Sequence, residues 1–139
     1  MRFRTAGGPY IVRLDPGERI VETLAALCAA EGIRAASITG LGTCVEAELG
    51  SLDWETKTHR LRRFEGHFEI AALVGNVSVQ DGKPLVHLHI TLADADGRAF
   101  SGHLHEAEIK ATGEIIITPL EGELRRRKDP DTGLNLIDP

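Results

Sequence analysis

The residues that could carry chemistry are histidines, and four of the six in this chain lie between positions 87 and 105. They form two His-x-His pairs, His87 with His89 and His103 with His105, in segments that alternate apolar and polar residues. Side chains alternate between the two faces of a β-strand, so each pair presents both imidazoles on one face. Three histidines with an open fourth position are a known zinc arrangement. The spacing therefore predicts a metal site.

The turn between the two segments determines whether the pairs meet. Asp96-Gly97 is typical of a β-hairpin, but a two-residue loop would place Ile90 opposite His103. The apolar face of one strand would then continue into the polar face of the other, which burial forbids. A three-residue loop over residues 95–97, with a left-handed glycine in a bulge, removes the conflict and pairs residue 94 with residue 98. Hydrophobic patterning therefore favours the three-residue loop.

In that register His89 faces His103, and His87 faces His105. Directly opposed residues have Cβ atoms about 4.5–5.5 Å apart, close enough for imidazoles to share one ion. Two alternatives remain open: the histidines form a solvated strand face, or they hydrogen-bond within an interface. We favour metal binding over both alternatives, because hydrophobic patterning alone already brings the two His-x-His pairs together.

Composition limits the class of protein. A chain of 139 residues with 42% hydrophobic and 27% charged residues is expected to form one domain, spanning residues 1–139. Its net charge of −5 argues against DNA binding by bulk electrostatics. No apolar run is long enough to cross a bilayer, and no secretory h-region is visible. Cys28 and Cys44 are expected to be buried free thiols, so we predict a cytoplasmic protein.

One main helix is predicted from about residue 18 to residue 31. Asp15 is expected to be its N-cap, Pro16 its first helical residue, and Glu18 the partner in a capping box. Apolar residues follow at helical spacing, and Gly32 is expected to end the helix in the left-handed conformation.

Strand-like segments follow the helix in a hairpin-linked series. One early helix and a long run of such strands predict an α+β fold with a largely antiparallel central sheet. Residues 1–14 are predicted to form one or two edge strands, broken at residues 7–9 and resuming over 10–14. The other segments predicted as strands are 33–41, 43–53, 57–64, 68–79, 86–92, 99–105 and 113–118.

The chain ends in a basic run followed by apolar residues. The run is either a solvated strand end or a set of DNA phosphate contacts. The apolar residues that follow suggest that an extension from about residue 125 to residue 139 docks on the body or on a neighbouring subunit. The basic residues are Arg125, Arg126, Arg127 and Lys128, and the apolar ones are Leu134, Leu136 and Ile137.

The order of several motifs resembles that of the PPC (plants and prokaryotes conserved) domain. These motifs are the segment from Phe68 to Asn76, the Asp81-Gly82-Lys83-Pro84 turn, His87-x-His89, Asp96-Gly97-Arg98, and Gly102-His103-Leu104-x-Glu106. The resemblance extends to Tyr10, the Asp15–Glu18 helix start and the Asp129–Leu134 ending.

The resemblance implies an α+β fold with a central antiparallel sheet, a homotrimer and, in prokaryotic members, a bound metal. Carried over to this sequence, the metal ligands are His87, His89 and His103, and the ion is divalent, with zinc expected. His105 has no counterpart in the family pattern. Plant members add an AT-hook with an Arg-Gly-Arg-Pro core, which this sequence lacks.

Three functions are consistent with these observations. The first is a regulatory metal-holding trimer that binds DNA or another partner, as the family label suggests. The second is a zinc-dependent hydrolase or lyase, in which Glu69 or Glu106 acts as general base and His105 supports the site. The third is a structural metal that stabilises the trimer. We predict a metal-binding homotrimer and leave its reaction or DNA target open.

Overall fold

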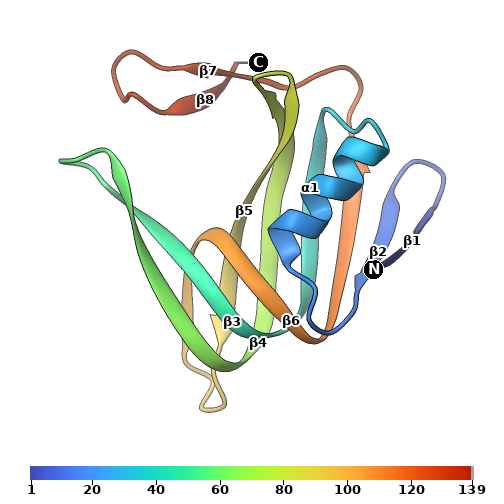
Figure 1. The fold of residues 1–139 in the computed structure, drawn as a ribbon, viewed down its shortest axis with the longest axis vertical. Coiled ribbons are helices and arrows are strands. Elements are labelled where there is room, and N and C mark those ends of the chain that lie inside the picture. Colours follow the sequence, from blue (N-terminus) through green and yellow to red (C-terminus); the bar gives the residue numbers. More distant parts are fainter. Residues whose placement is uncertain (139) are drawn as a thin grey trace.

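The computed structural model describes residues 1–138, with His59 described by its backbone alone. These residues form an eight-stranded sheet and a single helix, α1 (Figure 1). All the strand pairs are antiparallel except a short one between β4 and β7, which confirms the predicted α+β class with a largely antiparallel sheet. The elements are β1 (Arg2–Thr5), β2 (Tyr10–Leu14), α1 (Ile20–Ala30), β3 (Ala36–Asp53), β4 (Thr58–Gln80), β5 (Lys83–Ala93), β6 (Ala99–Pro119), β7 (Arg125–Lys128) and β8 (Asn135–Asp138).

The sheet partly closes on itself. Its main order is β1-β2-β6-β3-β4-β7-β8, and β5 pairs with both β4 and β6. Because β3 also pairs with β4 and with β6, strands β3 to β6 form a closed ring over part of their length. Helix α1 lies across one face and packs against β5 and β6, while the β7–β8 hairpin lies near the ends of β4 and β5 (Figure 1).

Three strands are longer than the sequence predicted, and one of them, β6, runs unbroken from the predicted segment 99–105 into the predicted segment 113–118. β3 continues through the segment from Gly40 to Gly42, and β4 continues through Gly66, where breaks were expected. The φ angles are 153° at Gly42 and 142° at Gly66, and the pairing of β3 with β4 shifts register between Gly40 and Gly42. Glycine tolerates the positive φ that such an irregularity requires. These glycines bend continuous strands and do not end them.

The start of α1 also differs from the prediction. Gly17 has a φ of 82°, so residues 15–18 cannot be the first turn of a right-handed helix. They form a separate turn in which the Asp15 N–H donates to Glu18 Oε2 at 2.7 Å. α1 begins at Ile20, after Arg19, which makes no side-chain capping bond. The prediction of Asp15 as N-cap was wrong.

Glu106 of β6 provides the missing acceptors. Its carboxylate accepts hydrogen bonds from the backbone N–H groups of Val21 at 2.9 Å and Glu22 at 3.1 Å. Helix N-termini have unsatisfied N–H groups and a positive dipole end, which a carboxylate stabilises. The acceptor comes from a strand some 85 residues away in sequence, so no local pattern signals it.

The other end of α1 agrees with the prediction. Gly32 has a φ of 67°, and the Ile33 N–H donates to the Cys28 carbonyl at 2.9 Å. The Gly32 N–H donates to the Ala29 carbonyl at 3.4 Å, completing a Schellman motif.

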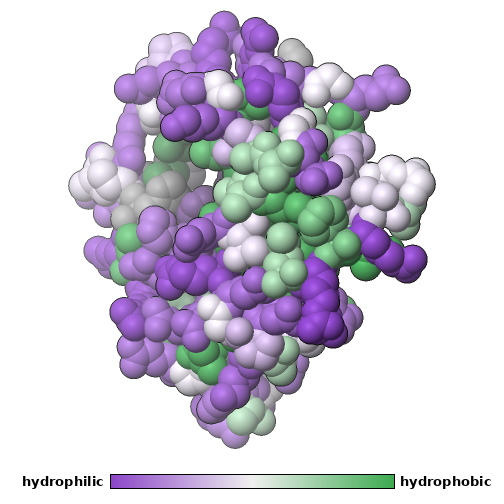
Figure 2. Space-filling model, turned by 45° about the vertical axis from the view of Figure 1, so that its right-hand side comes forward, coloured by the Kyte–Doolittle hydropathy of each residue, from purple (hydrophilic) through white to green (hydrophobic). Residues whose placement is uncertain are grey.

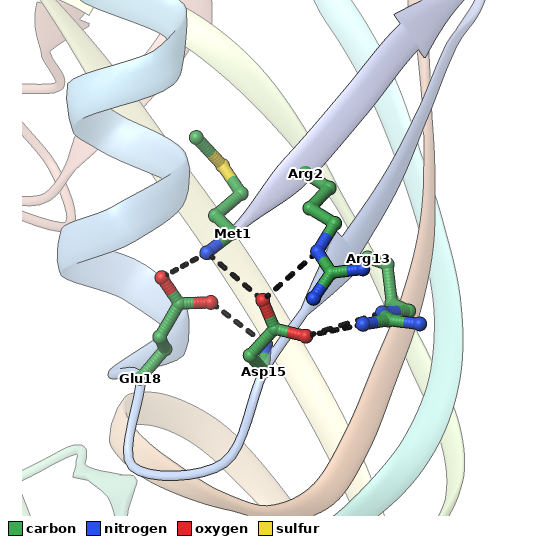
Figure 3. A network of polar contacts seen from close by, with 5 residues as sticks. All are labelled: Met1, Arg2, Arg13, Asp15 and Glu18. Carbon is green, nitrogen blue, oxygen red and sulfur yellow. Dashed lines mark hydrogen bonds and ion pairs between the residues drawn. The ribbon is translucent and has the colours of Figure 1, made fainter.

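A polar network joins the first residue to the turn before α1 (Figure 3). The Met1 amino group lies 2.5 Å from Glu18 and 3.4 Å from Asp15, and Arg2 and Arg13 also pair with Asp15. The hydrogen bond to Glu18 raises the pKa of the Met1 amino group, and the hydrogen bond from Arg13 lowers the pKa of Asp15. The network fastens β1 to the chain entering α1.

The core lies between α1 and the sheet face that it covers. Its residues include Leu24, Leu27, Ile38, Leu73, Leu88, Ile90, Ile115 and Ile117. Cys28 and Cys44 are buried there as free thiols, and burial raises the pKa of each to about 11.

On the side of α1 and β1–β2, Figure 2 shows a mostly hydrophilic surface with hydrophobic residues near its middle. Within residues 1–138, no helix has the length and apolar character needed to cross a membrane.

Candidate metal centre

The hairpin of β5 and β6 has the register that hydrophobic patterning predicts. His89 pairs with His103, and the Asp94 N–H donates to the Arg98 carbonyl at 3.0 Å. Gly97 has a φ of 77°, as the bulged three-residue loop requires. The apolar partners of this register lie in the core, so burial holds the two histidines opposite each other.

Three imidazoles converge at this point. The ring centroids are 5.6 Å apart for His89 and His103, 4.9 Å for His87 and His103, and 5.4 Å for His87 and His89. One ligand nitrogen from each lies within 4.8 Å of the others. Nitrogens around a tetrahedral zinc ion are about 3.3 Å apart, given Zn–N bonds of about 2.0–2.1 Å. Small side-chain movements would close the difference, so these three donors fit a metal such as zinc.

The fourth histidine of the double pair lies elsewhere. Over the described residues, β5 and β6 pair only as far as His89 and His103, and β6 then continues beside β3. The predicted pairing of His87 with His105 was therefore wrong. His105 is exposed, with its Nε2 3.6 Å from a carboxylate oxygen of Glu48 on β3. Strand β5 stays with β4, so the two histidine strands diverge beyond the His89–His103 pair.

Close approach of β4 and β5 positions His87. Gly75 of β4 lies so near that a Cβ atom there would be 1.9 Å from the His87 carbonyl oxygen. Only glycine fits at this position, because the obstructing atom belongs to the backbone.

The diverging strands leave a pocket of about 630 Å³, with His87, His89 and His103 in its wall. β3 contributes Leu52, and the C-terminal segment contributes Leu134 and other residues. This volume and mixed lining are typical of small-molecule sites. A metal ion on the histidines would face the pocket and not be enclosed by protein.

Arg126 reaches into the pocket from β7. Its guanidinium donates to His87 Nδ1 at 3.0 Å, Asn76 Oδ1 at 3.1 Å, Ser78 Oγ at 2.8 Å and the Asn135 carbonyl at 2.9 Å. Partial burial lowers the pKa of Arg126, although a guanidinium remains charged in proteins.

The side chains of the basic run lie in two environments, since Arg126 is half-buried at the pocket and the other three are exposed. The two arginines on either side of it, Arg125 and Arg127, are exposed and pair with Glu123 and Asp138, at 2.6 Å and 3.3 Å. Lys128 is exposed as well. Sequence reasoning grouped all four as candidate DNA contacts and missed the role of Arg126 beside His87. Alternation along a strand was the available signal, because it turns every second residue of the run to the same side.

The candidate carboxylates lie away from the three histidines. Glu106 is 8% exposed and accepts a third hydrogen bond, from the Ala107 N–H, besides those from α1. Glu69 is exposed on β4, opposite Thr43 and Ala93. Within the part of the chain that the structure describes, no aspartate or glutamate lines the histidine pocket.

Known proteins resemble the chain over nearly its whole length. A candidate DNA-binding protein from Bacteroides thetaiotaomicron shares 34% identity and a TM-score of 0.95, covering 99% of this chain and 96% of that one. A metal-containing protein from Archaeoglobus fulgidus shares 35% identity and a TM-score of 0.89, covering 100% and 99%.

A curated relative contains a similar segment within a longer protein. The bifunctional protein GlmU of Synechococcus is 35% identical over 127 residues, which are 89% of this chain and 19% of GlmU. The chain thus spans about a fifth of the length of that relative.

The family comparison agrees with the resemblance seen in the motifs. The model of the Plants and Prokaryotes Conserved (PCC) domain matches residues 1–121, which include all three histidines of the cluster and end before Arg126. The chain belongs to the Plants and Prokaryotes Conserved domain family.

Proposed function

We propose that this protein binds one divalent metal ion per chain, zinc, on His87, His89 and His103. The observation that carries the proposal is the convergence of three imidazoles whose ligand nitrogens lie within 4.8 Å of one another. The metal-containing protein from Archaeoglobus, which is similar over its full length, supports it.

The pocket favours an accessible metal over a purely structural one. Three protein ligands leave a coordination position open, and the histidines line a pocket of about 630 Å³. A zinc ion there would act as a Lewis acid and lower the pKa of a bound water. The chain's own contribution is to hold the three nitrogens on rigid strands.

Elemental analysis of untagged protein tests the proposal. We expect near-stoichiometric zinc in the wild type and in His105→Ala, and its loss in His89→Ala. His105 is the matched control because it is an exposed histidine that pairs with Glu48. Equal metal content in all three proteins, or none in the wild type, would contradict the ligand assignment.

We also propose that the protein is a homotrimer in the cytoplasm. An exposed apolar row supports self-association: Ile11 pairs with Ile116, and both Ile116 and Val74 pair with Thr39. Val74 is 51% exposed and Ile116 is 46% exposed, on the sheet face opposite α1. Exposed apolar side chains that gather on one face, as these do on either side of Thr39, are typical of protein interfaces.

Sedimentation equilibrium tests the oligomer. We expect three times the chain mass for the wild type and the monomer mass for Val74→Lys. Leu120→Lys is the control, since Leu120 is similarly exposed but lies beyond the end of β6. A monomeric wild type would contradict the proposal.

DNA binding is a second candidate function. The similar protein from Bacteroides supports it by its description, and Arg125, Arg127 and Lys128 are exposed together on β7. Fluorescence anisotropy with duplex DNA should show binding whose salt slope falls by about 0.9 for each phosphate contact removed. Replacing all three residues by glutamine should abolish most of that slope. Binding that is absent at low salt would exclude this function.

A further inference from the structure

The described residues that line the metal pocket carry a net positive charge. Arg126 is the only ionised side chain among the described residues that line it, and the metal ligands are neutral imidazoles. A divalent ion on the histidines would therefore add two positive charges beside a guanidinium, and none of the described lining residues has a carboxylate. Positive charges that are partly shielded from water attract an anion, so this pocket favours an anionic ligand.

The contact between Arg126 and His87 cannot persist when the metal binds. A guanidinium only donates hydrogen bonds, so His87 Nδ1 accepts and the ring proton of the neutral imidazole resides on Nε2. The lone pair of Nδ1 is then engaged by the hydrogen bond from Arg126. Nε2 has no in-plane lone pair to offer a metal, because it carries the proton. Coordination through either nitrogen of His87 breaks this hydrogen bond.

The guanidinium stays beside the site after that bond breaks. Its other hydrogen bonds, to Ser78, Asn76 and the Asn135 carbonyl, do not involve His87. These three hydrogen bonds would keep Arg126 in place when the metal binds. The N–H that had bonded His87 would then be released beside the metal ligands. An anion at the open coordination position would accept that N–H.

The remaining lining selects the kind of anion. Apolar side chains face the same pocket from three parts of the chain: Leu52 from β3, Leu85 and Val86 from β5, and Leu134 and Leu136 from the C-terminal segment. An inorganic anion would leave these side chains in contact with water. An organic anion would cover them.

We propose that the pocket binds a small organic carboxylate, with the carboxylate between the metal and Arg126 and an apolar tail against the leucines. This inference rests on the proposed metal site. It assigns Arg126 as the residue that recognises the anion, from a segment outside the residues that the family model matches.

Calorimetric titration of zinc-loaded, full-length protein with hexanoate tests the inference. We expect one hexanoate per chain, and affinity that increases about three- to fourfold for each buried methylene from acetate to hexanoate. Hexan-1-ol has the tail without the charge, and inorganic phosphate has the charge without the tail. Both should bind at least tenfold more weakly than hexanoate.

Arg126→Gln separates recognition from support of the fold. Hexanoate affinity should fall about 10- to 100-fold, the usual effect of losing a charge-assisted hydrogen bond. Zinc affinity, measured by chelator competition without carboxylate, should rise roughly tenfold because a competing donor and a like charge are removed. Arg127→Gln, which removes an exposed charge from the same strand, should change neither affinity.

The outcomes distinguish the two proposals. Zinc-loaded protein that does not bind hexanoate, or binds phosphate as tightly, overturns the carboxylate inference and leaves the metal site standing. A fall in both affinities in Arg126→Gln would show that Arg126 only supports the fold, and would also overturn it. Protein without zinc overturns both proposals. If Arg126→Gln does not fold, Arg126→Lys, which keeps the positive charge, should bind hexanoate within tenfold of the wild type. The series of carboxylates from acetate to hexanoate is measured on the wild type and does not depend on any variant.

Discussion

His103 and Glu106 lie three residues apart on β6, and both are titratable side chains that sequence reasoning considered for a metal site. His103 belongs to a cluster that lines a pocket of about 630 Å³. Glu106 is 8% exposed and accepts three backbone N–H groups, two of them from the start of α1. One residue lies where a ligand can reach it, and the other fastens a helix to a strand.

The difference lies in what surrounds each group within the fold. Three backbone N–H groups and, at 3.8 Å, the Arg19 guanidinium surround the Glu106 carboxylate, so its oxygens serve the fold. The three histidines instead present their nitrogens to one another across a space, with Arg126 as a donor to one of them. Polar side chains of a strand that bond the backbone of a neighbouring element support the fold, and those that converge on a pocket are candidates for function.

Replacement of Gly75 should have the largest effect, because it displaces the backbone of β5 at His87, one of the three clustered histidines. An alanine Cβ would overlap the His87 carbonyl oxygen, so Gly75→Ala should lower the free energy of unfolding by about 3 kcal/mol. Zinc affinity should fall with it, because β5 must move at His87. Urea denaturation and chelator competition measure the two effects.

Gly82→Ala is the control for conformational strain alone. Gly82 has a φ of 78°, and no atom lies within 4 Å of the point that an alanine Cβ would occupy. The substitution should therefore cost about 1–2 kcal/mol and leave zinc affinity unchanged. Equal stability of Gly75→Ala and wild type would show that β4 and β5 are less closely packed than described.

Loss of Glu106 should affect stability alone. Glu106→Ala leaves the N–H groups of Val21 and Glu22 without their acceptor and should lower the free energy of unfolding by about 2–3 kcal/mol. Glu106→Gln, which keeps one side-chain acceptor, should cost about half as much. The folded variants should retain full zinc content. A stable Glu106→Ala protein that has lost its metal would place Glu106 in the metal site.

Acidification should weaken the attachment of the C-terminal segment, which lines the pocket through residues such as Arg126 and Leu134. The hydrogen bond from Arg125 lowers the pKa of Glu123, and that from the Thr132 N–H lowers the pKa of Asp129. A carboxylate with a depressed pKa stabilises the fold above its ordinary value, 4.5 for Glu123, and this contribution disappears as pH falls through the folded value. Urea midpoints should therefore decrease below about pH 4.5, with a shallower decrease in Glu123→Gln. An identical pH dependence in that variant would contradict this assignment.

The cysteines should show the smallest effect, as buried groups without access to any ligand. Burial raises the pKa of Cys28 and Cys44 to about 11, so both are thiols at pH 8. Reaction with a disulfide reagent should be slower than that of free cysteine by at least on the order of a hundredfold, and both thiols should react after denaturation. Rapid reaction of the folded protein would show that one thiol is accessible.

Local patterns predicted the parts of the fold that depend on nearby residues. The end of α1 at Gly32 and the three-residue hairpin loop both follow from a left-handed glycine and adjacent patterning. The convergence of His89 with His103 follows from the same register. Each of these features is determined within a few residues of sequence.

The remainder depends on contacts between distant segments. The cap of α1 comes from Glu106, and the position of His105 depends on β6 leaving β5 to follow β3. Arg126 reaches His87 only because the β7–β8 hairpin folds back over the ends of β4 and β5. Sequence reasoning identified the three histidines that the structure brings together and missed the arginine that lies beside them.

Anomalous diffraction from crystals of the zinc-loaded protein tests the central claim most directly. We expect one zinc peak per chain, about 2.0–2.1 Å from one nitrogen each of His87, His89 and His103, with Arg126 no longer bonded to His87. A peak at His105 and Glu48, or no peak at the three histidines, would contradict the account.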